Sequence, residues 1–188
     1  CPEVCDGLDN DCNGKTDEGC DDDGDLYCDA AMMVMKGAKC TSSTVPSEAF
    51  KQVPGDDCTD DDGTVNPGTA EVCKNDKDDN CNGVQDEQDA VGCIKYYEDL
   101  DSDEYGTGQP KCLCAVSGSF KATVPGDCND GTKDINPGVT EKCVTESTDD
   151  NCNGSTNDLN AEGCSNFFTD LDSDAWGTTP FKCICVAE

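Results

Sequence analysis

A cysteine-bearing segment occurs three times in the chain, and this repetition constrains the fold more than any other feature. The copies read PEVCDGLDNDCNGKTDE, AEVCKNDKDDNCNGVQDE and TEKCVTESTDDNCNGSTND, and their second cysteines are Cys12, Cys81 and Cys152. The repeat period is therefore about 70 residues. We expect repeat 1 at residues 1–70, repeat 2 at 71–140 and a truncated repeat 3 at 141–188.

The apolar content is too low for an ordinary hydrophobic core. Ile, Leu, Val and Phe contribute 27 of 188 residues, about 14%, and the formal net charge is −30. Such chains are generally disordered, because the apolar area they bury does not offset chain entropy. The 18 cysteines and 42 carboxylates offer another way to fold. Disulfides and bound calcium would replace the core, and the alternative is an acidic disordered segment.

We therefore predict a small disulfide-rich, calcium-stabilised repeat, mostly loops with short β-strands and little helix. Gly, Pro, Asn and Asp interrupt the chain every few residues. The expected strands are IKYYEDL, CLCAV, SNFFTDL and CICV, and the helical candidates are SEAFK (47–51) and DAAMMVMKG (29–37). The longest apolar stretch, AAMMVM, is far below the ~20 residues of a membrane span.

The stretch DNDCNGKTDE has oxygen-bearing side chains at alternate positions, followed by glycine, as in a calcium-binding loop. Such loops bind through positions 1, 3, 5 and 9 and through the carbonyl of position 7, while a glycine at position 6 permits the turn. The alternative is three Asx-rich turns without an ion. With the acid after position 9, the candidate ligands are Asp9, Asp11, Asn13, Lys15, Asp17 and Glu18; Asp78, Asn80, Asn82, Val84, Asp86 and Glu87; and Asp149, Asn151, Asn153, Ser155, Asn157 and Asp158. The third copy carries the least charge, so we expect it to bind most weakly.

Further acidic groups could complete these shells, because the bidentate glutamate of a full loop is missing. One set alternates in the blocks DDDGDLY, DLDSDEYG and DLDSDAWG; the other surrounds the GDC cysteine or follows the NPG turn. We expect the second set to close the loop sites from outside. The two sets are Asp21, Asp23, Asp25, Asp99, Asp101, Asp103, Asp170, Asp172 and Asp174, and Asp57, Asp60, Glu71, Asp127, Asp130 and Glu141.

The sulfurs are expected to form disulfides rather than a zinc site. Zinc sites usually show paired C-x2-C motifs, whereas here the gap from the first to the second cysteine of each copy varies. Sequence does not fix the connectivity. One local scheme pairs Cys5–Cys12, Cys20–Cys28, Cys40–Cys58, Cys73–Cys81, Cys93–Cys112, Cys114–Cys128, Cys143–Cys152 and Cys164–Cys183. It leaves Cys1 and Cys185, which we expect to meet between subunits of a head-to-tail filament. The alternative is that Cys185 pairs with a cysteine in a stretch of the same chain outside this sequence.

VPGDCNDGTKDINPGVTEKC, joined to CDGLDNDCNGKTDEGC, resembles the repeats called putative metal-binding motifs, which are common in secreted and surface proteins of myxobacteria and other environmental bacteria. The DLDSDEYG blocks resemble thrombospondin type 3 calcium repeats more loosely. The resemblance implies an extracellular, multi-copy, cysteine-stapled, metal-binding module. Some relatives are discussed as copper binders. This chain has no histidine and its three methionines cluster at Met32, Met33 and Met35, which disfavours copper.

We expect a non-catalytic protein, because histidine is absent and no nucleophile–base pair is visible. The expected function is an extracellular calcium-binding structural repeat, as a subunit or segment of a filament, stalk or surface array. The alternative is an adhesive module that contacts glycans through its aromatic side chains, Tyr96, Tyr97, Tyr105, Phe167, Phe168 and Trp176. The strong acidity disfavours nucleic acid as a partner, and no membrane insertion is expected.

Overall fold

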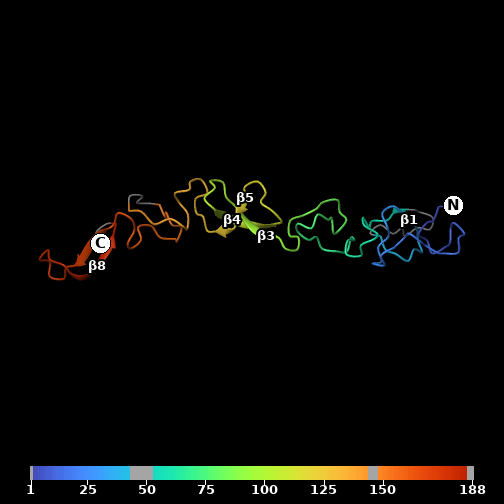
Figure 1. The fold of residues 1–188 in the computed structure, drawn as a ribbon. Coiled ribbons are helices and arrows are strands. Elements are labelled where there is room, and N and C mark those ends of the chain that lie inside the picture. The colour runs from blue at the N-terminus through green and yellow to red at the C-terminus, as the bar shows by residue number, and fades with distance from the viewer. Residues whose placement is uncertain (1, 43–52, 144–147, 186–188) are drawn as a thin grey trace. The chain divides into compact units, whose positions relative to one another are not determined.

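The computed structural model describes residues 2–42, 53–143 and 148–185. They contain short strands, turns and bends and no helix, which confirms the predicted disulfide-rich, loop-dominated fold. No described segment is a helix long and apolar enough to cross a membrane. The chain divides into two compact units, Cys1–Cys93 and Ile94–Glu188. Figure 1 shows the strands as small arrows in a chain that is otherwise loop.

The first unit has one short sheet, in which β1 (Met33–Val34) pairs antiparallel with β2 (Val53–Pro54). The helix considered for 29–37 is wrong, because this stretch forms a turn and then β1. The helical turn considered for 47–51 lies outside the described residues. The core here is a cluster of Cys5, Cys20, Cys28, Cys40 and Val34, against which Met32 and Ala38 pack. Sulfur thus replaces most of the branched aliphatic side chains of a usual core.

The second unit has a four-stranded sheet and a separate hairpin. The sheet order is β5 (Phe120–Ala122), β3 (Ile94–Glu98), β4 (Tyr105–Leu113) and β6 (Val124–Pro125), with only the β4–β6 pair parallel. The hairpin pairs β7 (Ser165–Thr169) with β8 (Thr178–Ile184). These positions confirm the strands expected at IKYYEDL and SNFFTDL. Of the other two expected strands, only the first two residues of each are strand, Cys112 and Leu113 at the end of β4 and Cys183 and Ile184 at the end of β8.

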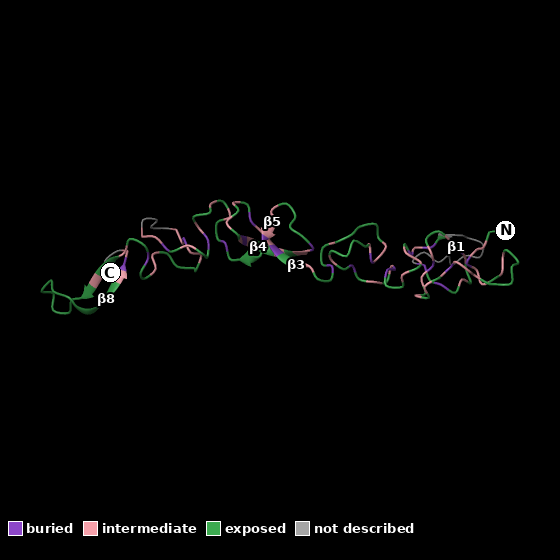
Figure 2. Ribbon diagram, viewed as in Figure 1, coloured by how far each residue is buried: buried purple, intermediate pink, exposed green. Residues whose placement is uncertain are grey.

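Buried polar groups are as prominent as buried apolar ones. Figure 2 shows the buried residues as short purple stretches between exposed and intermediate ones. Among the described residues, the buried carboxylates are Asp57, Glu71, Asp79, Asp99, Asp127, Glu141 and Asp150. Buried carboxylates are costly unless they are hydrogen-bonded, paired with a cation or bound to a metal, so each of them requires a partner.

Six disulfides have defined partners: Cys5–Cys20, Cys28–Cys40, Cys58–Cys81, Cys128–Cys152, Cys143–Cys185 and Cys164–Cys183. Cys73, Cys93, Cys112 and Cys114 are disulfide-bonded as well, whereas Cys12 is a free, exposed thiol. The abundance of disulfides indicates an oxidising environment.

Of the expected pairs, Cys164–Cys183 is confirmed. The pairs that are wrong, because a member has another partner or is free, are Cys5–Cys12, Cys20–Cys28, Cys40–Cys58, Cys73–Cys81, Cys114–Cys128 and Cys143–Cys152. The expected Cys185–Cys1 link between subunits is wrong too, since Cys185 bonds Cys143.

Backbone pairing between distant segments explains these errors. The Cys143 N–H donates to the Glu162 carbonyl at 3.0 Å, which holds Cys143 beside the start of the β7–β8 hairpin. In the first repeat, the Cys5 N–H donates instead to the Met33 carbonyl at 2.9 Å. Neighbours in space, rather than neighbours in sequence, therefore decide which sulfurs meet.

Candidate metal sites

The first motif loop folds around its own Asx side chains. Asp9 accepts the N–H groups of Asn13 at 3.1 Å and Gly14 at 2.9 Å, and Asp11 accepts the Asn13 N–H at 3.0 Å. Asn13 in turn accepts the Lys15 N–H at 2.9 Å. These linked turns wind the chain around positions 1, 3 and 5, so that the oxygen-bearing side chains of the loop are gathered together.

The other two copies have the same hydrogen bonds. Asp78 accepts Asn82 N–H at 3.1 Å and Gly83 N–H at 2.7 Å, and Asp149 accepts Asn153 N–H at 3.1 Å and Gly154 N–H at 2.7 Å. The position-7 residues, Val84 and Ser155, donate their N–H groups to Asn82 and Asn153 as Lys15 does to Asn13. The three sequence copies are thus three copies of one loop geometry.

The acid at the end of each loop folds back onto its centre. Glu18 accepts the side-chain amide of Asn13, Glu87 those of Asn80 and Asn82, and Asp158 those of Asn151 and Asn153. Asp17 instead binds the N–H groups of Asp6 and Gly7 through Oδ1, at 3.0 and 2.9 Å, and its counterpart Asp86 binds the Lys74 N–H. The structure thus brings Glu18, Glu87 and Asp158 to the loop centre, while Asp17 and Asp86 anchor the preceding turn.

Glu71 and Glu141 support the loops from the buried side. Glu71 accepts the N–H groups of Asp79 and Asp86, both at 3.0 Å, through its two carboxylate oxygens. Glu141 accepts those of Asp150 at 2.9 Å and Asn157 at 2.8 Å. Both glutamates were expected to close the metal shell, and in the structure their oxygens accept backbone N–H groups of the loops.

Glu3 is a candidate site residue that the sequence analysis did not include. It occupies the repeat position of Glu71 and Glu141, accepts the N–H of Asp17 at 3.2 Å, and has a carboxylate oxygen within 4.8 Å of oxygens of Asp9 and Asp11. Its place in the repeat was the signal that could have identified it.

A second kind of acidic cluster lies next to the GDDC turn of the first unit. Oxygens of Asp21, Asp23 and Asp25 lie within 4.8 Å of one another. Asp60 accepts the Asp22 N–H at 3.3 Å, so the GDDC segment reaches this block. Burial raises the pKa of Asp57, and the charges of Asp25 and Asp23 raise it further. The GDDC segment thus lies against the DDDGD block, and Asp57 also lies beside the second motif loop, with its Oδ1 4.0 Å from Cys81 Sγ.

The second unit repeats this cluster. Oxygens of Asp99, Asp101 and Asp103 lie within 4.8 Å of one another, and Asp130 accepts the Leu100 N–H at 2.6 Å. Burial raises the pKa of Asp127, and the charges of Asp103 and Asp101 raise it further. The two clusters therefore share one plan, with an acidic block on one side and the GDC turn on the other.

The third acidic block is open. Asp170, Asp172 and Asp174 are exposed, and Asp170 accepts the N–H groups of Ser173 at 2.8 Å and Ala175 at 3.0 Å. No GDC turn lies against it among the described residues. The third block thus forms the same backbone turn as the other two blocks, but its aspartates are exposed.

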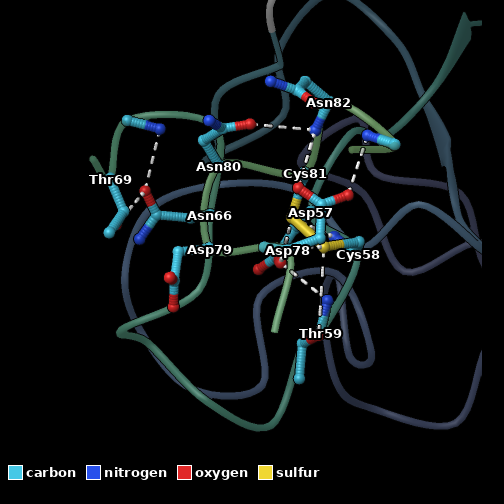
Figure 3. The surroundings of a disulfide bond; sticks show 12 residues. Asp57, Cys58, Thr59, Asn66, Thr69, Asp78, Asp79, Asn80, Cys81 and Asn82 are labelled. Carbon is cyan, nitrogen blue, oxygen red and sulfur yellow. Dashed lines mark hydrogen bonds between the residues drawn. A yellow bond between two sulfur atoms is a disulfide. The ribbon is translucent and has the colours of Figure 1, made fainter. Parts of the chain in front are cut away.

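The disulfides connect the GDC turns to the motif loops. Figure 3 shows the Cys58–Cys81 bond beside Asp57, with Asp78, Asn80 and Asn82 around it. The Cys58 N–H lies 3.0 Å from Cys81 Sγ, and the Cys128 N–H lies 3.1 Å from Cys152 Sγ. Since these sulfurs are oxidised, carboxylate and amide oxygens are the donors available for a metal.

Comparison with known proteins gives one match. The family Cu-binding_MopE, described as putative metal-binding motif, matches residues 1–18, 57–87 and 127–158. These segments contain the motif loops and GDC turns and exclude the blocks at 21–25, 99–103 and 170–174. No curated protein and no solved structure matches the chain.

The family name refers to copper, and the donor set of this chain does not fit a copper site. Copper sites in proteins are built mainly from imidazole, thiolate and thioether ligands. The chain has no histidine, and Cys12 is the one free thiol among the described residues. The gathered donors are hard oxygens, which suit calcium or magnesium. The recognition of the repeat from its sequence is confirmed: three segments of this chain match the model of the putative metal-binding motif family.

Proposed function

We propose that the chain is an extracellular, calcium-binding structural repeat without catalytic activity. The observation that supports it best is the motif loop, which occurs three times with the same hydrogen bonds and gathers oxygens at positions 1, 3 and 5. The family match supports metal binding in general, and the oxygen donors support calcium in particular.

Calcium is favoured over magnesium by the make-up of the loops. Magnesium needs a tight octahedral shell and keeps several waters, whereas calcium accepts six to eight oxygens from a flexible loop. Each motif loop offers several carboxylate and amide oxygens from consecutive turns, as at Asp9, Asp11 and Asn13. Such a loop can supply many ligands but cannot impose a rigid octahedron.

The structural role follows from what holds the fold together. A net charge of −30 opposes compaction, and the apolar core is small. Bound calcium would neutralise the carboxylates where they crowd most, and the disulfides would fix the same loops. A rigid, multi-copy module of this kind suits a filament, stalk or surface array. Cys185 would not form a covalent link to a neighbouring subunit, since it bonds Cys143.

Chelation tests the proposal. The oxidised protein at neutral pH should bind several calcium ions, and EGTA should lower its Tm and open it to proteolysis. Magnesium at the same concentration should restore little of the lost stability. Asp9→Asn, Asp78→Asn and Asp149→Asn should each weaken binding. Asp76→Asn, an exposed acid of the second loop outside the ligand positions, is the matched control. Unfolding and proteolysis profiles that do not respond to EGTA would refute the proposal.

An adhesive role is the second candidate, and the third repeat supplies the observation for it. Trp176 and Leu171 are 81% and 90% exposed, and both line a groove that also contains Asp172 and Asp174. Tyr96, by contrast, is buried. A glycan array probed with the native protein and with Trp176→Ala tests this role, which requires binding that the variant loses.

A further inference from the structure

Two aspartates in the GDC turns are buried with an oxygen that has no partner. Asp57 is 0% exposed and Asp127 is 5% exposed. In each, Oδ1 accepts one backbone N–H, from Thr59 at 2.9 Å and from Asn129 at 2.8 Å, whereas Oδ2 is buried without any hydrogen bond among the described residues. A buried carboxylate oxygen without a partner is costly. Its occurrence at the same position of two repeats calls for a common explanation.

The groups around Asp57 are also acidic and also incomplete. Asp57 lies beside the chain that follows the block, since its N–H donates to the Cys28 carbonyl at 3.0 Å, and the charges of Asp25 and Asp23 raise its pKa. Asp21 Oδ1, Asp23 Oδ2 and Asp25 Oδ2 are buried without hydrogen bonds among the described residues. Their other oxygens accept backbone N–H groups, for example that of Tyr27 on Asp25 Oδ1 at 2.8 Å. Each carboxylate of this block therefore uses one oxygen to fix its position and leaves the second unsatisfied.

The second unit shows the same arrangement around Asp127. The Asp127 N–H donates to the Gly106 carbonyl at 3.2 Å, and the charges of Asp103 and Asp101 raise the pKa of Asp127. Both oxygens of Asp101 and Oδ2 of Asp103 are buried without hydrogen bonds in the described part of the chain. The Lys121 ammonium lies 3.9 Å from Asp99 and is the one cation that the described ion pairs place in this cluster. One lysine at that distance does not neutralise the several carboxylates gathered there.

We propose that each cluster binds one calcium ion between its acidic block and its GDC turn, and that this site is separate from the motif loops. Asp57 and Asp127 would ligate through Oδ2, opposite Asp21, Asp23 and Asp25 in the first unit and Asp99, Asp101 and Asp103 in the second. Residues 21–25 and 99–103 lie outside the segments that the family model matches. The inference rests on the proposed function only for the identity of the cation.

The position of these sites gives them a distinct role. Asp25 and Asp57 lie 32 residues apart in the sequence, and Asp103 and Asp127 lie 24 residues apart. Each ion would therefore join the acidic block that follows one motif loop to the GDC turn that precedes the next. The motif loop, in contrast, closes a single short stretch of chain.

Paired substitutions test the inference. Asp57→Asn/Asp127→Asn removes both buried carboxylates with little change of shape, and Asp61→Asn/Asp134→Asn removes the same charge from exposed aspartates of the same turns. The bound calcium of the oxidised protein is counted by native mass spectrometry and by equilibrium dialysis. The first variant should bind two ions fewer than the parent, and the second should equal the parent. The triple variant Asp9→Asn/Asp78→Asn/Asp149→Asn should lose the motif-loop ions and keep these two.

Thermal unfolding in EGTA shows whether a lost ion reflects a lost fold. Without calcium, Asp57→Asn/Asp127→Asn relieves repulsion between buried carboxylates, so its Tm should equal or exceed that of the parent. If the parent binds calcium and this variant binds the same number of ions, the inference is overturned and the proposed function stays intact. Absence of calcium binding by the parent would overturn both. A Tm in EGTA well below that of the parent would also overturn the inference, by showing that the two aspartates stabilise the fold without an ion.

Discussion

Cys58 and Cys81 form a disulfide that joins the first GDC turn to the centre of the second motif loop, with their Cα atoms 5.5 Å apart. Cys128 and Cys152 form the same bond one repeat later, with the same Cα separation. Cys81 and Cys152 both have left-handed backbone conformations, with φ of 55°. The bond thus fixes a tight turn within the loop and ties that loop to the turn that carries Asp57 or Asp127.

Removal of this bond should weaken both stability and calcium binding. The Cys58–Cys81 bond closes a segment with a sequence separation of 23, and a loop of that size predicts a loss of about 3 kcal/mol for Cys58→Ser/Cys81→Ser. Denaturant unfolding with calcium present measures the loss. Cys12→Ser is the matched control, because Cys12 has the same loop position and no disulfide. Equal stability of the double variant and the control would contradict the prediction.

Cys12 should react with alkylating reagents in the native protein, unlike its two counterparts. It is exposed and free, whereas Cys81 and Cys152 are bonded to Cys58 and Cys128. Treatment with iodoacetamide without reductant, followed by peptide mapping, should find the label on Cys12 and not on Cys81 or Cys152. Reduction before labelling is the control and should expose all three. Label on Cys81 in the unreduced protein would show that the assigned bond is wrong.

Glu71→Gln should destabilise the second motif loop. The carboxylate accepts two backbone N–H groups in a buried position, and the amide would turn a donor toward one of them. Loss of one such charged hydrogen bond predicts about 2 kcal/mol. Glu141→Gln should behave alike in the third loop, while Glu162→Gln, at an exposed position, should change stability little. Denaturant unfolding of the three variants compares them directly.

The sequence predicted the motif loops better than the distant segments that pair with them. Positions 1, 3, 5 and 6 of each loop follow from local turn chemistry, so Asp78, Asn80 and Asn82 could be placed from their spacing alone. The disulfides and the second acidic clusters depend on which distant segments pair. The contact of the GDDC segment with the DDDGD block could not be predicted, because the sequence does not show that the Asp22 N–H meets Asp60. Burial of Asp57 is likewise a tertiary property.

Without calcium, the protein should lose stability as the pH rises from about 4 to about 6. Burial raises the pKa of Asp60 from 3.8 to about 6, with nearby Asp29 and Asp22 adding to the rise. Between these values the folded protein keeps a proton that the unfolded chain has released, so the free energy of unfolding falls with increasing pH. The raised pKa values of Asp57, Asp101 and Asp127 act in the same direction.

Thermal unfolding of protein freed of calcium on a chelating resin measures this effect. The Tm should fall across the interval, and Asp60→Asn should reduce the slope. Saturating calcium should also reduce it, because the ion takes over the neutralising role of the proton. A Tm that rises with pH in the calcium-free protein would contradict the prediction.

Gly138→Ala should disturb the second acidic cluster from a distance. A Cβ at Gly138 would lie 2.5 Å from the Tyr105 hydroxyl and 3.0 Å from its ring, and Tyr105 donates its N–H to Asp103 at 2.9 Å. A Cβ at Gly126, directly before Asp127, would lie 3.2 Å from the neighbouring Pro137. Overpacking of this kind predicts a loss of about 1–3 kcal/mol, together with weaker calcium binding by the second unit. Gly131→Ala is the control, since its Cβ would meet only Asn129 Oδ1, at 3.4 Å. Calorimetry and calcium titration of both variants test the link, and identical calcium titrations would show that the NPG turn does not position the cluster.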